Sequence, residues 1–354
     1  MTFLRAQRKR KHVIIVMILG ILLFGCSPPP EQDTGPETLA ISAEPNEAGA
    51  QSDKITFSLE FEPGTKTRYR VTTETIMALE SLENASKNNT STTPLPKVSE
   101  SSEVIFTQEI LGPVSETTNT VIALVTIEHV GYNLTSPGQS DLLFNSQKTT
   151  DQNSPFTKLI GQTYTIEVSP LGYVPGIFNL HPARLAVRGP TPAHAAALEL
   201  VSPPAIFSRH GFFSVPGPDV GSLSVGGRWR GVQQLTLITS GTDIYRLGTH
   251  RFDKIYQLES LEQRQMGTVG AVVFVGSPRS RRTSDGRFIE VPFLSCSYAG
   301  GGEFNIDAGR VESYFEQLEV RMPLPETGSL PTEDTEDRIV IATRFCRVQR
   351  LDLD

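Results

Sequence analysis

The side chains of this sequence whose types could support chemistry are its histidines, its clustered carboxylates and its cysteines. Five histidines beyond the N-terminal region are scattered without metal-ligand spacing: His129, His181, His194, His210 and His250. Two carboxylates about 5–10 Å apart could act as acid and base in glycan hydrolysis. The candidates by residue type are Glu259 with Glu262, and Asp334 with Glu336 and Asp337. None of these groups forms a recognisable catalytic constellation in the sequence.

Three common catalytic motifs are also missing from the sequence. A nucleophile elbow needs Gly-x-Ser-x-Gly, and the run Gly-Ser-Leu-Ser-Val-Gly at 221–226 has a different spacing. The chain contains no His-Glu-x-x-His helix motif and no glycine-rich loop that ends in Lys-Ser or Lys-Thr. The sequence therefore predicts no cofactor and no metal.

Cys26 stands at the end of an export signal. Five basic residues precede an apolar run at 13–24, and a small residue, Gly25, comes directly before the cysteine. The run is too short for a comfortable membrane span, which takes about 20 apolar residues. The segment 1–25 is therefore predicted to be a signal peptide.

The residues Leu-Phe-Gly-Cys at 23–26 resemble the bacterial lipobox, in which a signal peptidase cuts before the cysteine. This resemblance implies that Cys26 becomes the acylated N-terminus, and two or three acyl chains hold a protein stably on a membrane. Ser27, in place of Asp, resembles the pattern of lipoproteins that are sorted outward. The expected location is the cell envelope, at an outer membrane and facing the periplasm or the cell surface. Residues 26–53 are predicted to form a lipidated, disordered tether, and residues 54–354 a single domain.

The charge of the chain limits its partners. Loss of the signal peptide, with its five basic residues, lowers the net charge from −7 to −12, which argues against nucleic acid as a partner. One local positive surface is predicted from Arg279, Arg281, Arg282 and Arg287, where phosphate groups of lipid or of a wall polymer could bind. The alternative is a solvated loop that keeps a sheet edge soluble.

Two cysteines remain after the anchor, Cys296 and Cys346. In an oxidising envelope, two such cysteines are typical of one disulfide. Each lies in a strand-like run, so the prediction requires that the two strands be neighbours.

The apolar residues of the domain recur mostly with the period of two that is typical of strands. Strands are predicted at 55–61, from 69, and at 104–111, 120–130, 162–168, 229–239, 243–252, 254–262, 270–275, 288–298, 303–306, 311–322 and 338–348. One helix is predicted at 192–202, with Thr191 as its cap and Pro203-Pro204 as its end. The predicted fold is mainly β: a large curled antiparallel sheet or half-barrel with one short helix packed on its concave face.

The predicted helix is too small to fill such a sheet. Its apolar face consists of three alanines, one leucine and one valine. We therefore predict an apolar ligand groove beside it, covered by residues 203–220, with a fully packed core as the alternative. Its predicted lining residues are Phe57, Phe61, Ala197, Phe212, Phe213 and Trp229. Trp229 could stack on a sugar or anchor the core.

Four blocks of the sequence, at 57–71, 159–174, 212–229 and 300–311, resemble a family of secreted domains of unknown function common in planctomycete-type lipoproteins. The family has no agreed activity. Its usual Gly-Asp-x-Trp is Gly-Gly-Arg-Trp at 226–229 here, so no acidic role is carried over to that turn. Its architecture is similar to LolA- and LolB-like half-barrels, which shelter apolar ligands.

The function expected from the sequence is that of a membrane-anchored, non-enzymatic envelope lipoprotein. It would bind an apolar ligand such as a lipid, or a protein or polymer of the envelope. One alternative is a cell-surface hydrolase acting on glycan or ester substrates, and another is a structural surface component. The sequence indicates no oligomeric state.

Overall fold

A computed structural model describes ten segments of the chain: residues 54–81, 97–115, 118–138, 140–217, 220–237, 248–279, 281–282, 288–289, 293–323 and 338–353. The predicted signal peptide, Cys26 and the tether at 26–53 lie outside the described residues, as does Arg287.

The described residues are dominated by one sheet of twelve strands. Its strands are β1 (Lys66–Ser81), β2 (Lys97–Ser115), β3 (Thr118–Thr135), β4 (Leu142–Asn145), β5 (Thr163–Val168), β6 (Ile177–Phe178), β7 (Arg228–Leu237), β8 (Gly248–Arg264), β9 (Gly267–Pro278), β12 (Ser295–Asn305), β13 (Arg310–Pro323) and β14 (Arg338–Leu351). Two further short strands, β10 (Arg281–Arg282) and β11 (Phe288–Ile289), pair with each other. Lys54–Asp354 forms one compact unit.

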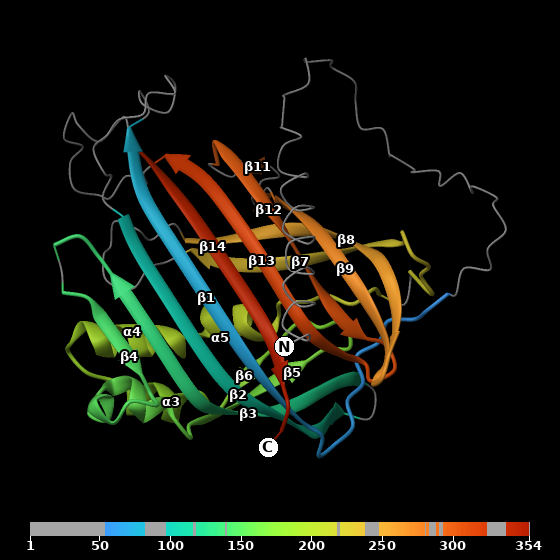
Figure 1. Ribbon diagram of the computed structural model, residues 1–354, viewed down its shortest axis with the longest axis horizontal. Helices are drawn as coiled ribbons and strands as arrows, with labels where there is room; N and C mark the ends of the chain where they lie inside the picture. The colour runs from blue at the N-terminus through green and yellow to red at the C-terminus, as the bar shows by residue number, and fades with distance from the viewer. Residues whose placement is uncertain are drawn as a thin grey trace, which may run out of the picture. The chain divides into compact units, whose positions relative to one another are not determined.

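The strands follow the order β6-β5-β3-β2-β1-β14-β13-β12-β9-β8-β7, with β4 beside β3. Every pairing is antiparallel, and the path has two separate ends, β6 and β7. Figure 1 shows β14, the last strand of the chain, between β1 and β13 in the middle of the sheet. The predicted fold class, a mainly β curled antiparallel sheet, is confirmed, and the sheet does not close on itself.

One face of the sheet is covered by helix α5 (Pro203–His210), and we call it the inner face. The Ser208 hydroxyl of α5 accepts a hydrogen bond of 2.8 Å from Arg344 on β14, and the His210 ring lies 4.6 Å from the Phe106 ring of β2. Alternation along β13 brings Tyr314, Glu316 and Leu318 to this buried face. The core therefore lies between the inner face and the helices, and Figure 1 shows α5 behind β1.

Helix α4 (Pro192–Leu200) begins where it is predicted, because the Thr191 side chain accepts a hydrogen bond from the backbone N–H of His194. α4 ends before Pro203-Pro204, as predicted, but the prediction of a single helix is wrong, because a second helix, α5, follows it. These prolines occupy the first turn of α5, where no intrahelical N–H is needed, and the Ser202 side chain caps that turn. A third helix, α3 (His181–Ala186), and two 3₁₀ turns, η1 (Thr149–Asp151) and η2 (Pro155–Leu159), are additional to the prediction.

The predicted strand at 55–61 is also wrong. This segment joins no strand of the sheet and makes one bridge, between Ile55 and Leu223. Its alternation has another cause: Phe57 packs inward, 5.3 Å from the rings of both Trp229 and Phe304. The turn after it is as predicted, with Gly64 at a φ of +84°, where glycine has no steric penalty.

Candidate functional site

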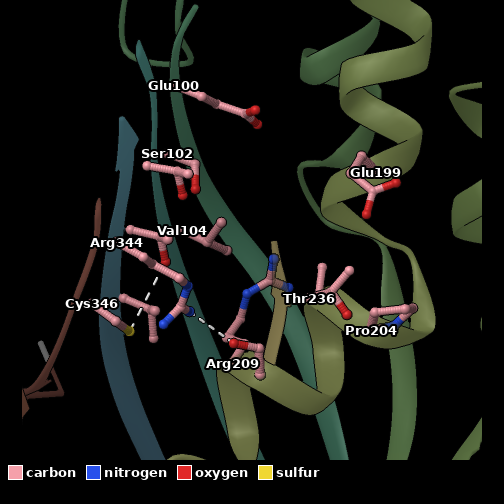
Figure 2. Close-up of a pocket in the computed structure, with 14 residues that line it drawn as sticks. Glu100, Ser102, Val104, Glu199, Pro204, Arg209, Thr236, Arg344 and Cys346 are labelled. Atoms are coloured by element: carbon pink, nitrogen blue, oxygen red, sulfur yellow. Dashed lines mark hydrogen bonds between the residues drawn. The ribbon is translucent and has the colours of Figure 1, made fainter. Parts of the chain in front are cut away.

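A polar cavity lies between the inner face and helices α4 and α5. Its volume is about 100 Å³, and β1, β2, β7 and β14 supply its other walls. Figure 2 shows residues from the sheet facing residues from the helices across it. The lining residues are Val71, Thr73, Thr75, Glu100, Ser102, Val104, Glu199, Pro204, Ala205, Ser208, Arg209, Thr236, Arg344 and Cys346.

Arg344 connects this cavity to a buried ionic cluster. Its guanidinium donates to Glu316 Oε1 on β13 and to the Ser208 hydroxyl. The other carboxylate oxygen, Glu316 Oε2, lies 3.2 Å from the ammonium of Lys254 on β8. Three charged residues from three strands therefore meet in the core, because the sheet curls β8 toward β13 and β14.

Two tyrosine hydroxyls complete the ionic cluster. The Tyr314 hydroxyl accepts from Lys254 at 2.6 Å and donates to Glu316 at 2.6 Å. The Tyr298 hydroxyl lies 2.6 Å from Glu316 Oε2 and 2.9 Å from Oε1 of Gln233. Each oxygen of the carboxylate therefore has charged and hydrogen-bonding partners, which is what a buried charge requires.

The ionisation of the cluster follows from these contacts. Burial opposes the charged form of Glu316, but Lys254, Arg344 and the two tyrosine hydroxyls outweigh it and lower the pKa of the carboxyl to about 2. Burial lowers the pKa of the Lys254 ammonium to about 8, although Glu316 opposes that shift. At neutral pH the cluster thus holds one anion and two cations.

Aromatic rings enclose the Lys254 ammonium. Its nitrogen lies 4.1 Å from the ring centre of Phe274 and 4.9 Å from that of Tyr298, distances at which a cation is attracted to a ring face. Glycines leave room for these rings: a Cβ at Gly276 would lie 2.3 Å from the Tyr298 ring, and one at Gly300 would lie 2.6 Å from the Phe274 ring. Lys254 is fully enclosed, so this lysine stabilises the fold and is closed to a substrate.

Arg209 is the second guanidinium of the cavity, and it differs from Arg344. Its side chain is buried, and it donates to the Leu200 carbonyl at 2.8 Å and to the Tyr164 hydroxyl at 3.4 Å. Within the described part of the chain no carboxylate forms a salt bridge with it. A buried cation with neutral partners leaves positive potential at the cavity wall.

The cavity also carries two carboxylates, Glu100 from β2 and Glu199 from α4. Figure 2 shows Glu100 above Ser102 and Val104, on the side away from Arg344. Glu199 accepts a hydrogen bond of 2.9 Å from the Ser202 hydroxyl. The cavity therefore offers a cationic part and an anionic part to a small polar group.

The predicted groove residues lie in the packed core. Phe57, Ala197, Phe212, Phe213 and Trp229 are buried, and Phe61 packs against the same core. Their rings contact one another or other core rings; Phe213, for example, stacks on Phe304 at 5.8 Å. None of these six residues lines one of the described cavities. Residues 203–217 form α5 and part of this core, and they line the polar cavity through Pro204, Ala205, Ser208 and Arg209.

The predicted disulfide between Cys296 and Cys346 is wrong. Cys296 is on β12 and lies opposite Val320 of β13. Cys346 is on β14 and lies opposite Glu316, which is also on β13. With β13 between them, the two strands are about 9–10 Å apart, and the four-residue offset adds to this. A disulfide needs Cα atoms within about 7 Å, so the sheet order keeps these thiols apart.

The predicted basic surface is described in part. Arg279 is exposed and lies 3.6 Å from Asp253. Arg281 and Arg282 form β10, which pairs with Phe288 and Ile289 of β11.

The residues that sequence reasoning missed are Arg209, Arg344, Lys254 and Glu316. The sequence pattern could have indicated three of them: Lys254, Glu316 and Arg344. Each occupies an inward position of a strand, with apolar residues two positions before and after it. A charge at such a position is rarely buried alone. Which charges meet depends on strand order, and that order is not readable from alternation.

In the described residues no group of three His, Cys, Asp or Glu side chains is placed to hold a metal ion. Among the described helices, none has both the length and the apolar character needed to cross a membrane.

Comparisons with known proteins do not assign the chain to a family. No family model matches it, and no curated protein matches it. A solved structure of lipovitellin, concerned with lipid–protein interactions, is 13% identical, with a TM-score of 0.41 over 83% of this chain. The chain spans 26% of the length of that lipovitellin chain.

Two other matches come from outer-membrane and autotransporter structures. The β domain of the Bordetella autotransporter BrkA is 9% identical, with a TM-score of 0.21 over 81% of this chain and 99% of that one. An outer membrane channel from Pseudomonas putida F1 is 10% identical, with a TM-score of 0.22 over 82% of this chain and 97% of that one. Sequence identities and TM-scores this low support no conclusion about function.

Proposed function

We propose that this chain is a lipid-anchored envelope protein that binds a small anionic group in the cavity between α4, α5 and the sheet. The observation that supports the proposal is that two buried guanidiniums, Arg209 from α5 and Arg344 from β14, line one cavity. Arginine presents planar donors that match carboxylate and phosphate oxygens. Arg344 is already paired with Glu316, so Arg209 is the residue that an incoming anion would neutralise.

The size and polarity of the cavity limit which ligands can bind in it. At about 100 Å³ the cavity has room for roughly three or four water molecules at liquid density. That space suits a carboxylate, a phosphate or a polar head group, but it is too small for an acyl chain. The expected apolar ligand is therefore replaced in this proposal by an anionic group, either free or at the head of a lipid.

The carboxylates of Glu100 and Glu199 refine the choice of ligand. They would repel a simple anion that extended into their part of the cavity, and they would attract an ammonium there. A zwitterionic group, with phosphate or carboxylate next to an amine, fits both parts of the cavity. Phosphoethanolamine is the simplest probe of this chemistry.

Arg209→Met is expected to weaken phosphoethanolamine binding by about ten- to a hundredfold, the value of a charged hydrogen-bonding group of about 1.5–3 kcal/mol. The measurement is isothermal titration of the full-length protein in detergent, with inorganic phosphate as a second probe. Arg347→Met removes an exposed arginine of β14 that lies outside the cavity and serves as the matched control. Equal loss in the control, or no binding by the unmodified protein, would contradict the proposal.

Two further measurements sharpen this test. Arg209→Lys keeps the positive charge and is expected to retain part of the binding, whereas a variant that merely misfolds would lose its thermal transition as well. Native mass spectrometry of protein purified from membranes distinguishes the two sources of the group. A co-purified phospholipid indicates a lipid head group, and its absence together with binding of the free probe indicates a soluble ligand.

Cys26→Ala is expected to abolish the anchor, since the proposed acylation takes place on the Cys26 thiol. The variant should stay at precursor mass and should incorporate no radiolabelled palmitate, whereas the unmodified protein should be labelled and should sediment with membranes. Ser27→Ala, at the next position, is a control that leaves the acceptor thiol in place. Cleavage of the Cys26→Ala protein at the usual site, or an unlabelled soluble wild type, would count against the anchor.

A further inference from the structure

A serine, a histidine and a glutamate meet on the outer face of the sheet, away from the polar cavity. Ser146 follows β4, His129 is on β3 and Glu103 is on β2. Glu103 alternates with Ser102 and Val104, which line the cavity of the inner face, so its side chain belongs to the opposite face. Strand pairing brings the three together, because Glu103 lies opposite Gly131 and Asn145 also lies opposite Gly131.

The three side chains form a continuous chain of hydrogen bonds. The Ser146 hydroxyl lies 2.6 Å from His129 Nδ1, and His129 Nε2 lies 3.3 Å from Glu103 Oε1. A carboxylate only accepts, so Nε2 carries the proton and Nδ1 is left to accept from the serine hydroxyl. This is the order of nucleophile, base and orienting acid that defines a hydrolytic triad.

The surroundings suit the roles of these residues. His129 is buried, and burial lowers the pKa of its imidazole, against the effect of Glu103. The imidazole is therefore neutral at neutral pH, as a base must be. The backbone N–H of Val130 donates to the Ser146 hydroxyl at 3.2 Å, which fixes the position of the hydroxyl oxygen.

Ser146 and His129 line an open pocket of about 550 Å³. Gln147 and Gln152 line the same pocket and carry side-chain N–H groups, the kind of donor that stabilises an oxyanion. Ile105 and Ile160 supply an apolar wall beside them. The pocket thus has room for a short acyl group and a polar alcohol.

We propose that Ser146, His129 and Glu103 hydrolyse short-chain acyl esters at this pocket, an activity separate from anion binding on the inner face. The Ser146 oxygen would attack the ester carbonyl carbon while its proton passes to His129 Nδ1. The alcohol then leaves with that proton, and the acyl group stays on the serine. Water attacks this acyl-serine, returns a proton through His129 and releases the acid, so that ester and water become acid and alcohol.

The test measures hydrolysis of p-nitrophenyl acetate and butyrate by the full-length protein, together with covalent labelling by a fluorophosphonate. The expected result is measurable turnover and one label on Ser146. Ser146→Ala should lower kcat by at least about a hundredfold and abolish labelling, because removal of a triad member costs several orders of magnitude. Ser154→Ala, near the pocket but outside the triad, should leave both unchanged.

Glu103→Gln separates a catalytic arrangement from a structural one. The variant keeps the shape of the side chain but loses the charge that orients His129, so kcat should fall by at least tenfold while the thermal transition and KM change little. Three outcomes would overturn the proposal: no hydrolysis or labelling by the wild type, equal activity in Ser146→Ala, or a label that persists in that variant.

Discussion

Replacement of Glu316 by leucine is expected to destabilise the protein by about 3–5 kcal/mol, the cost of removing one partner from a buried ion pair. The carboxylate of Glu316 neutralises both Lys254 and Arg344 in the core. Without it, two cations would remain buried beside each other. Chemical denaturation, read by tryptophan fluorescence, measures the change.

The matched control for Glu316 is Glu319→Leu. Glu319 is on the same strand but alternates to the other face, where a substitution changes stability by about 0.5 kcal/mol or less. The double variant Lys254→Met with Glu316→Leu is expected to recover part of the loss, because one of the two unpaired cations is gone. Equal stability of Glu316→Leu and the control would show that the ionic cluster does not stabilise the fold.

The same carboxyl produces an acid dependence with a definite sign. The pKa of Glu316 is lowered from 4.5 to about 2 in the folded protein, despite the opposing effect of burial, by the charges of Lys254 and Arg344. Its contribution to stability is therefore fully present above pH 4.5 and is lost as the pH falls from 4.5 toward 2. Glu316→Gln should flatten this part of the stability profile.

Replacement of Trp229 by alanine is expected to cost about 3–5 kcal/mol, as for other buried aromatic side chains. Trp229 is buried, stacks on Tyr256 at 5.3 Å and donates from Nε1 to the Ser214 carbonyl at 2.8 Å. These contacts join β7 and β8 to the connector that follows α5. Thermal and chemical unfolding would measure the loss.

Trp229→Phe distinguishes packing from the hydrogen bond of the indole. Phenylalanine keeps a ring in the core but leaves the Ser214 carbonyl without its donor, so a smaller loss of about 1–3 kcal/mol is expected. The sugar-stacking alternative makes the opposite prediction: little change in stability with a loss of glycan binding. Unchanged unfolding of Trp229→Ala would therefore overturn the assignment of this residue to the core.

The strands of this protein were largely readable from its sequence because the signal for a strand is local. A residue every second position faces the core, and β13 (Arg310–Pro323) and β14 (Arg338–Leu351) show this alternation almost without interruption. The start of α4 was readable for the same reason, since Thr191 caps its own helix. The start of α5 was missed because two adjacent prolines can stop one helix or begin the next.

The functional candidates were not readable in this way, because they depend on which strands become neighbours. The tertiary structure placed β14 between β1 and β13, and this separated Cys296 from Cys346 while it joined Glu316 to Arg344. The pairing of β2, β3 and β4 brought Ser146 to His129 and Glu103. Alternation states which face a side chain occupies but carries no information about the partner strand. The sequence alone therefore determined the fold class, and the anchor at Cys26 stays a prediction from the sequence. Only long-range strand pairing decided the composition of each candidate site.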